Sequence, residues 1–252
     1  TYTAIITDAR GCTASTTIIL TAPTPIDLQA TLSSYAGGQA ISCFDANDGS
    51  IDLQVNGGAG GYLYTWTGSG AFASTSQDVS GLGAGTYSVN VIDINGCQAQ
   101  ASFTLLAPQP LNAGAVVINA LCQGNADGAI DLTITGGTAP YTQTWSNNFG
   151  LFSSTQQDLS GLFAGVYTVT IDDANGCRFL RSFNVDEPEQ FLIDGRIEQY
   201  PGGSNVSCAG ASDGGIEVDV TGGTAPYILT WLTPSGTVGN TTQLTGIPAG
   251  SY

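Results

Sequence analysis

Six cysteines are the residues of this chain with the clearest chemistry. They form two series of constant phase: Cys12, Cys97 and Cys177, and Cys43, Cys122 and Cys208. Both series advance in steps of 79 to 86 residues. Two cysteines per step, in a chain without Met or His, are typical of a disulfide framework outside the cytoplasm. A zinc site is disfavoured, because the sequence has no Cys-x-x-Cys pair and no His.

Carboxylates are the other chemically capable side chains, with 20 acidic residues against 4 basic ones. Without His, neither a Ser-His-Asp nor a Cys-His nucleophile can form. The pair Asp172 and Asp173 lies in a predicted tight turn, where Asp is expected for its turn geometry alone. We therefore assign no catalytic residue and predict that the segment is not an enzyme.

The net charge of −16 excludes several kinds of partner. A protein that binds nucleic acid needs Lys and Arg to neutralise phosphates, and an anionic membrane surface attracts basic segments. No apolar stretch approaches the ~18 residues of a membrane span. The charge permits binding of divalent cations, and it keeps a long molecule soluble and self-repelling.

The cysteine spacing is one sign of a repeat that extends over the whole chain. Aromatic residues recur at the same steps, and the chain begins and ends at one phase of the repeat, at Tyr2 and Tyr252. We expect a window from a longer tandem array, which is a spacing or mechanical device before anything else. The predicted domains are the C-terminal part of a repeat at 1–22, complete repeats at 23–107 and 108–188, and the N-terminal part of a repeat at 189–252.

Each complete repeat carries the pattern of an all-β domain. In the second one, Ile130, Leu132 and Ile134 alternate with polar residues, as do Tyr167, Val169 and Ile171. About seven such segments, separated by Gly-rich and Asn-Gly turns, predict an immunoglobulin-like or fibronectin-III-like β-sandwich. The residues that recur once per repeat at apolar positions are the predicted core: Trp66, Trp145, Trp231, Tyr87 and Tyr167.

Short proline-marked junctions separate the predicted sandwiches, at 22–25, 107–110 and 187–188. Proline fixes φ and few residues are free to bend. We therefore expect sandwiches in a semi-rigid linear array.

Three disulfide pairings remain open on this fold, and free thiols are a fourth alternative. The first joins Cys43 to Cys97 and Cys122 to Cys177 inside each repeat, and one pair per repeat is the commonest arrangement, so we prefer it. Its difficulty is that these turns lie at opposite poles of a sandwich, ~17–20 Å apart, whereas bonded Cα atoms lie within ~7 Å. The second joins neighbouring repeats through Cys43 and Cys177, because those poles meet. The third joins Cys97 to Cys122 and Cys177 to Cys208 across each junction.

Acidic turns at the poles raise a hypothesis about a cation. Stacked domains could bring them together around a structural Ca²⁺, which takes six to eight oxygen ligands. The candidate ligands come from turns at both poles: Asp45, Asp48, Asp127, Asp173 and Asp213. The favoured interpretation is that Asp-Gly and Asn-Gly serve as hairpin turns and that no cofactor is bound.

Several short sequence motifs recur along the chain. Among them are Gly-Gly-Thr-Ala-Pro-Tyr followed by Trp, as at 136–145, and Asp-x-Asn-Gly-Cys, as at 173–177. Together they resemble the SprB-type repeat of gliding-motility surface adhesins of Bacteroidota, over essentially the whole chain. Departures are small: 57–62 lacks the Pro, and Arg10 stands where Asn is found elsewhere.

The resemblance implies a non-catalytic stalk of a secreted adhesin filament at the outer cell surface. It implies export by type IX secretion and movement by the gliding machinery. The expected partners are neighbouring repeats of the same chain and, through the parent protein, a surface or polysaccharide ligand. Two alternatives stay open: a spacer of a secreted polysaccharide-degrading enzyme, and a carbohydrate-binding module. The second would need loop aromatics at one phase, but the loop aromatics lie at different phases: Tyr35, Phe44, Phe72, Phe149 and Phe152.

Overall fold

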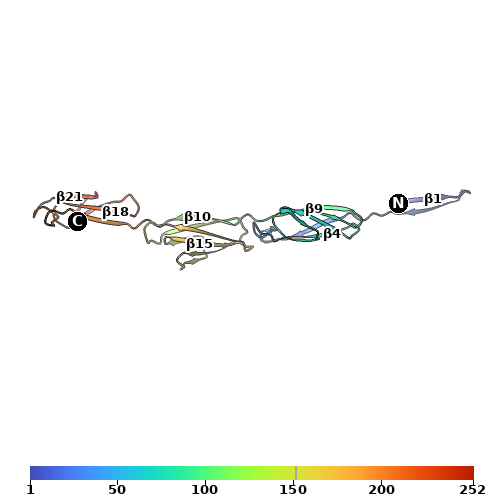
Figure 1. Ribbon diagram of the computed structural model, residues 1–252, viewed down its shortest axis with the longest axis horizontal. Coiled ribbons are helices and arrows are strands. Elements are labelled where there is room, and N and C mark those ends of the chain that lie inside the picture. Colours follow the sequence, from blue (N-terminus) through green and yellow to red (C-terminus); the bar gives the residue numbers. More distant parts are fainter. Residues whose placement is uncertain (151) are drawn as a thin grey trace. The chain divides into compact units, whose positions relative to one another are not determined.

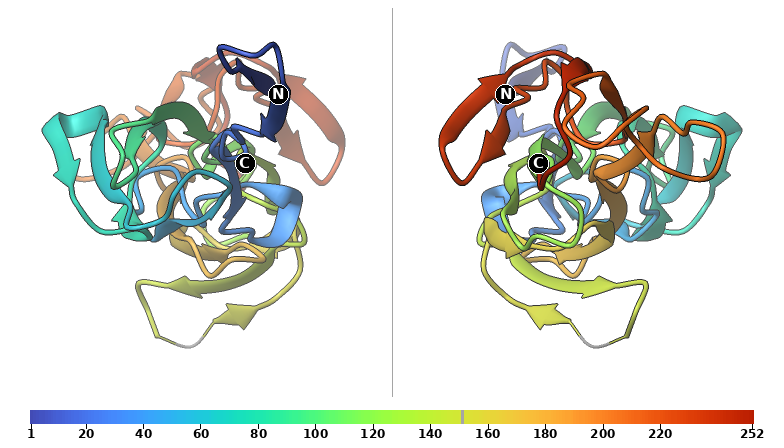
Figure 2. Two further views of the ribbon diagram at one scale, coloured as in Figure 1. Left: turned by 90° about the vertical axis from the view of Figure 1, so that its right-hand side faces the viewer. Right: turned by 90° about the vertical axis from the view of Figure 1, so that its left-hand side faces the viewer.

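The computed structural model describes residues 1–150 and 152–252, and it contains strands, turns and short 3₁₀ segments (Figures 1 and 2). The prediction of an all-β chain is confirmed. No helix in this described part of the chain is long and apolar enough to cross a membrane.

The first complete sandwich consists of two antiparallel sheets. One has the order β3-β4-β7 and the other β6-β5-β8-β9. The strands are β3 (Asp27–Leu32), β4 (Gly49–Asn56), β5 (Leu63–Gly68), β6 (Phe72–Ser74), β7 (Val79–Leu82), β8 (Gly85–Ile92) and β9 (Gln98–Leu105). Seven strands divided in this way are an immunoglobulin-like arrangement.

The second sandwich repeats this topology with the orders β10-β11-β14 and β13-β12-β15-β16. Its strands are β10 (Asn112–Ile118), β11 (Gly128–Thr135), β12 (Thr142–Asn147), β13 (Ser153–Ser154), β14 (Leu159–Leu162), β15 (Gly165–Asp172) and β16 (Arg178–Val185). The two sets of seven strands begin and end at equivalent positions of the sequence repeat. The prediction of tandem sandwiches is therefore confirmed.

Partial sets of strands flank the two sandwiches. A hairpin of β1 (Tyr2–Thr7) and β2 (Thr13–Ile18) precedes them. The following set has the sheets β17-β18-β21 and β19-β20. Its strands are β17 (Leu192–Ile197), β18 (Gly214–Thr221), β19 (Trp231–Thr233), β20 (Gly236–Gly239) and β21 (Gln243–Ile247).

The chain forms two compact units. One comprises Thr1–Asn112 with Ile134–Thr142 and Asp172–Phe179, and the other comprises the remainder. The first unit therefore contains the first sandwich together with two turns of the second sandwich.

The recurring aromatic residues lie in the cores, as predicted. Trp66 and Trp145 are both 0% exposed, and each indole donates a hydrogen bond to a backbone carbonyl at 3.0 Å. The phenols of Tyr87 and Tyr167 each donate to the carbonyl four residues earlier, at 3.0 Å. These are the hydrogen bonds of a tyrosine corner. Trp231 is 9% exposed in the less complete strand set.

Candidate functional site

The loop between β3 and β4 presents Cys43 at the end of the first sandwich. The Asp48 carboxylate accepts hydrogen bonds from the backbone N–H of Ser42 at 3.2 Å and from its hydroxyl. Tyr35 closes the loop by donating its phenol to the Asp48 carbonyl at 2.9 Å. Desolvation alone would raise the pKa of Asp48, but the hydrogen bonds from Ser42 outweigh it and lower that pKa. The loop is thus pre-shaped beside Cys43.

The turn between β15 and β16 presents Cys177 from the second sandwich. One carboxylate oxygen of Asp173 accepts the N–H groups of Asn175 and Cys177, both at 2.9 Å, and the other accepts the N–H of Thr138 at 2.8 Å. Gly176 has φ +81°, a left-handed conformation that glycine adopts without strain. The buried Asp173 carboxylate therefore fixes the direction of the cysteine.

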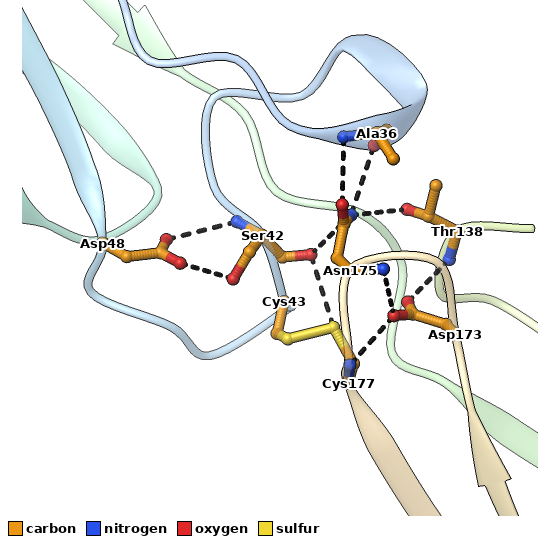
Figure 3. Close-up of a disulfide and its surroundings, with 8 residues drawn as sticks. All are labelled: Ala36, Ser42, Cys43, Asp48, Thr138, Asp173, Asn175 and Cys177. Atoms are coloured by element: carbon orange, nitrogen blue, oxygen red, sulfur yellow. Dashed lines mark hydrogen bonds between the residues drawn. A yellow bond between two sulfur atoms is a disulfide. The ribbon is translucent and has the colours of Figure 1, made fainter.

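A disulfide joins these two elements, Cys43 to Cys177, with their Cα atoms 5.7 Å apart and a sequence separation of 134 (Figure 3). This is the second of the three predicted pairings. The pairing of Cys43 with Cys97, which we preferred, is wrong, because Cys43 follows β3 whereas Cys97 lies in the turn before β9. Strands of six to eight residues, ~20–27 Å long, separate these two ends of one sandwich.

Asn175 forms a polar clamp beside the disulfide (Figure 3). Its side-chain oxygen accepts the N–H of Ala36 at 2.9 Å. Its amide nitrogen donates to the carbonyls of Ala36 and Ser42 at 3.2 and 3.1 Å, and to the Thr138 hydroxyl at 3.2 Å. One side chain therefore links loops of two successive sandwiches. An amide suits this position because it supplies both a donor and an acceptor.

The turn before β9 in the first sandwich has the same architecture. Asp93, 4% exposed, accepts the N–H groups of Ala59, Asn95 and Cys97 at 2.8–3.0 Å. The bond from Ala59 and then those from the turn lower the pKa of Asp93 against the effect of its desolvation. The turn before the last strand, which carries the cysteine, therefore has the same hydrogen bonds to an aspartate in both sandwiches.

The remaining cysteines are exposed thiols with no disulfide partner within the described residues: Cys12, Cys97, Cys122 and Cys208. The pairing of Cys122 with Cys177 is excluded by the Cys43–Cys177 bond, and so is that of Cys177 with Cys208.

Four of the five acidic residues proposed for a cation accept hydrogen bonds in the structure. Asp127 accepts the N–H of Leu121 at 3.1 Å, and Asp213 accepts the N–H of Ser207 at 3.1 Å, as Asp48 and Asp173 do in their own turns. Asp45 is exposed. Over residues 1–150 and 152–252, no group of three or more metal-binding side chains is close enough to hold an ion. These four carboxylates shape turns, and a bound Ca²⁺ stays a hypothesis beside the favoured interpretation that no cofactor is bound.

Apart from Tyr35, which closes the Cys43 loop, the loop aromatics divide into two groups. Phe72 and Phe152 pack edge-on against the tyrosine-corner rings of their own sandwiches, with centroids 5.4 and 5.3 Å apart. Phe44 and Phe149 are exposed, at 56% and 63%. These two lie in different loops of their sandwiches, so they do not form a repeated sugar-binding surface.

Asn175 is the main residue of the junction to which the sequence analysis gave no role. Asn175 belongs to the recurring motif Asp-x-Asn-Gly-Cys, which the sequence alone reveals. Only its position opposite the Cys43 loop shows that the Asn side chain binds across the junction.

Fold and site together define a class: tandem immunoglobulin-like modules, two of which are joined to each other by a disulfide. The model of the SprB repeat matches this chain three times, at residues 39–71, 114–149 and 204–236. The predicted resemblance to the SprB repeat is therefore confirmed in these three regions. Each match begins before a cysteine of the second series, Cys43, Cys122 or Cys208, and extends past the core Trp of that repeat.

A search of curated protein sequences finds no match. Among solved structures, sidekick-1 immunoglobulin domains 1–5 are similar at 11% identity and a TM-score of 0.39, covering 93% of this chain and 55% of that one. The amphioxus IgVJ-C2 molecule is similar at 14% identity and a TM-score of 0.30, covering 58% of this chain and 99% of that one. The N-terminal eight Ig domains of Down Syndrome Cell Adhesion Molecule give 13% identity, a TM-score of 0.31, and coverage of 78% and 29%.

Proposed function

We propose that this chain is a non-catalytic stalk segment of a long, secreted adhesin filament at the outer cell surface. The observation that carries the proposal is the junction itself. The Cys43–Cys177 bond and the Asn175 clamp tie one sandwich to the next, so that the connection does not depend on the linker alone. A binding module or an enzyme has no need of a covalent bond between its repeats, whereas a load-bearing stalk does.

The remaining properties fit the same role. The net charge of −16 makes parallel filaments repel one another and stay separate. A disulfide persists in an oxidising compartment, which agrees with a site outside the cell. The SprB-type motifs are the reason to place the parent protein in gliding motility and surface attachment, with export by type IX secretion. Its partners would then be neighbouring repeats, the gliding and secretion machinery, and a surface or polysaccharide ligand bound elsewhere in the parent.

The test is the contour length of the intact parent molecule, released from the cell surface and imaged as single particles. We expect a thin filament many domains long. A compact particle with a large globular head and few repeats would overturn the stalk proposal. It would favour a spacer attached to a polysaccharide-degrading enzyme, and activity assays on polysaccharides would then be directed at the head.

A further inference from the structure

The clamp residue Asn175 is followed by Gly176, and Asn-Gly is the sequence at which asparagine side chains deamidate fastest. The backbone nitrogen of the residue after an asparagine attacks its side-chain carbonyl carbon, and a glycine has no side chain to hinder that approach. Gly176 is exposed, and beyond its chain neighbours no heavy atom lies within 4 Å of the place where its Cβ would stand. Neither bulk nor a neighbouring group therefore shields this peptide bond from water.

In the closed junction, both reacting groups are engaged in hydrogen bonds. The Gly176 N–H donates to the Asp173 carbonyl at 3.0 Å. The side-chain amide of Asn175 makes four hydrogen bonds, which hold it against the loop that carries Ala36 and Ser42 (Figure 3). For the reaction, the amide must leave these partners and turn toward the Gly176 nitrogen. The clamp therefore opposes deamidation.

Most of this protection comes from the neighbouring sandwich. Three of the four bonds join Asn175 to Ala36 and Ser42, and only the bond to the Thr138 hydroxyl stays within the second sandwich. The disulfide is directly adjacent, because its two cysteines follow Ser42 and Gly176 in the sequence. Whether the junction is closed or open therefore decides whether the amide is held or free to react.

We propose that Asn175 is a site of spontaneous deamidation that the closed junction protects, so that opening of the junction is recorded as an aspartate or isoaspartate at this position. The Gly176 nitrogen bonds to Cγ of Asn175, the Cγ–Nδ2 bond breaks, and ammonia leaves with the proton of the Gly176 N–H. Water then opens the cyclic imide at either of its carbonyl carbons, and no electrons are gained or lost. The proposal rests on the junction geometry and not on the adhesin role.

The product of the reaction does not fit the closed junction. Deamidation replaces the amide nitrogen of Asn175 with a carboxylate oxygen, which only accepts hydrogen bonds. That oxygen would face the carbonyls of Ala36 and Ser42, to which the amide nitrogen donates at 3.2 and 3.1 Å. The two carbonyls lose their donor and meet a negative charge instead. Isoaspartate also lengthens the backbone before Cys177, which displaces the cysteine. A junction that has opened and deamidated therefore closes less well than before.

The first experiment compares deamidation in the full oxidised chain with that in two variants at Ala36. Ala36→Pro removes the N–H that donates to Asn175, and proline is tolerated here because Ala36 begins a 3₁₀ segment after an extended residue. Ala36→Gly keeps the N–H and is the matched control. After incubation at neutral pH, peptide mapping by mass spectrometry measures aspartate and isoaspartate at position 175. Asn95, at the opposite pole of the first sandwich, is the internal standard.

Asn175 should deamidate at least about fivefold faster in Ala36→Pro than in wild type, which is equivalent to ~1 kcal/mol for a lost hydrogen bond. Ala36→Gly should leave the rate unchanged, and recovery of the Cys43–Cys177 peptide shows that both variants have formed the junction. The double variant Cys43→Ser with Cys177→Ser should also accelerate the reaction, whereas Cys97→Ser should not. Equal rates in wild type, Ala36→Pro and the double variant would overturn the proposal.

A second experiment tests whether the product hinders closure of the junction. Asn175→Asp carries the deamidated side chain from the start, and Asn95→Asp is its matched control. The reduced chains are equilibrated in a glutathione buffer, in which oxidised glutathione takes up the two electrons and two protons released by each disulfide formed. The equilibrium constant for the Cys43–Cys177 bond should fall at least about fivefold in Asn175→Asp and stay at the wild-type value in Asn95→Asp. A wild-type equilibrium constant in Asn175→Asp would contradict the record of opening.

Discussion

The Cys43–Cys177 bond predicts how far the chain can be stretched. Pulled by its two ends, the oxidised protein transmits force across the disulfide, so the 134-residue interval between the two cysteines stays outside the path of the force even when both sandwiches unfold. An extended residue contributes ~3.3–3.6 Å, so the reduced chain should extend further by about 440–480 Å. In the chain-entropy model, closing a loop of this size also destabilises the unfolded state by about 5 kcal/mol at 25 °C.

The assay is single-molecule force spectroscopy of the chain held at both termini, with and without reductant. The double variant Cys43→Ser with Cys177→Ser should reach the full reduced length without reductant. The matched control is Cys97→Ser with Cys122→Ser, which removes two exposed thiols and should keep the shorter oxidised length.

The alternative pairing gives a different record. Bonds within each repeat would hide two separate loops of roughly 180–200 Å each, and the control variant would release both. Such a release, or equal lengths for oxidised wild type and the Cys43–Cys177 double variant, would refute the reasoning.

Other predictions concern the clamp, the core, the acidic turns and the cation. Asn175→Ala should lower the free energy of unfolding by ~1–3 kcal/mol, since backbone groups lose their partner, while Asn95→Ala, in the matching turn, should cost less; denaturant titration of the oxidised protein compares them. Trp145→Ala should cost ~3–5 kcal/mol by the same titration, because it empties a fully buried site. The pKa of Asp93 is lowered in the folded state, so its contribution is present above its ordinary pKa of ~3.9 and is lost as pH falls below it; Asp93→Asn should flatten the decline in melting temperature on acidification. Adding millimolar Ca²⁺ after chelation should leave the melting temperature unchanged, because turn carboxylates such as Asp173 already accept N–H groups.

Each of these has an outcome that would contradict it. Equal losses for Asn175→Ala and Asn95→Ala would mean that the bonds across the junction add nothing. A small loss for Trp145→Ala would show that the core collapses around the gap. An unaltered acid transition in Asp93→Asn would remove that carboxylate as its source. A melting temperature that rises with Ca²⁺ would instead support a cation at the poles.

The sequence was sufficient to predict the sandwiches, because the signals for strands and turns are local and recur once per repeat. Alternation at Ile130, Leu132 and Ile134 predicted β11, and alternation at Tyr167, Val169 and Ile171 predicted β15. Recurrence of Trp at one phase separated a core residue from an incidental aromatic. None of these predictions depends on how one domain is oriented against the next.

The disulfide could not be decided in that way, because it depends on a relation between domains. The spacing places one cysteine of each series in each repeat, and this agrees equally with pairing inside a repeat and with pairing between repeats. The two pairings are distinguished by the topology, because the loop before β4 and the turn before β9 lie at opposite ends of the strands. The predicted topology already contains this distance, and the distance favours a bond between domains over a bond within one.

Asn175 could be predicted from the sequence only in part. The amide could be recognised as part of a turn from its neighbours, Asp173 and Gly176, but its four hydrogen bonds reach residues that are distant in the sequence. The loop that supplies Ala36 also differs in length between the two sandwiches. Arg10 keeps the turn hydrogen bond to Asp8, but a guanidinium only donates and cannot reproduce the acceptor half of the Asn175 clamp. The turn is therefore set by its own neighbours in the sequence, whereas the clamp depends on an amide at this one position.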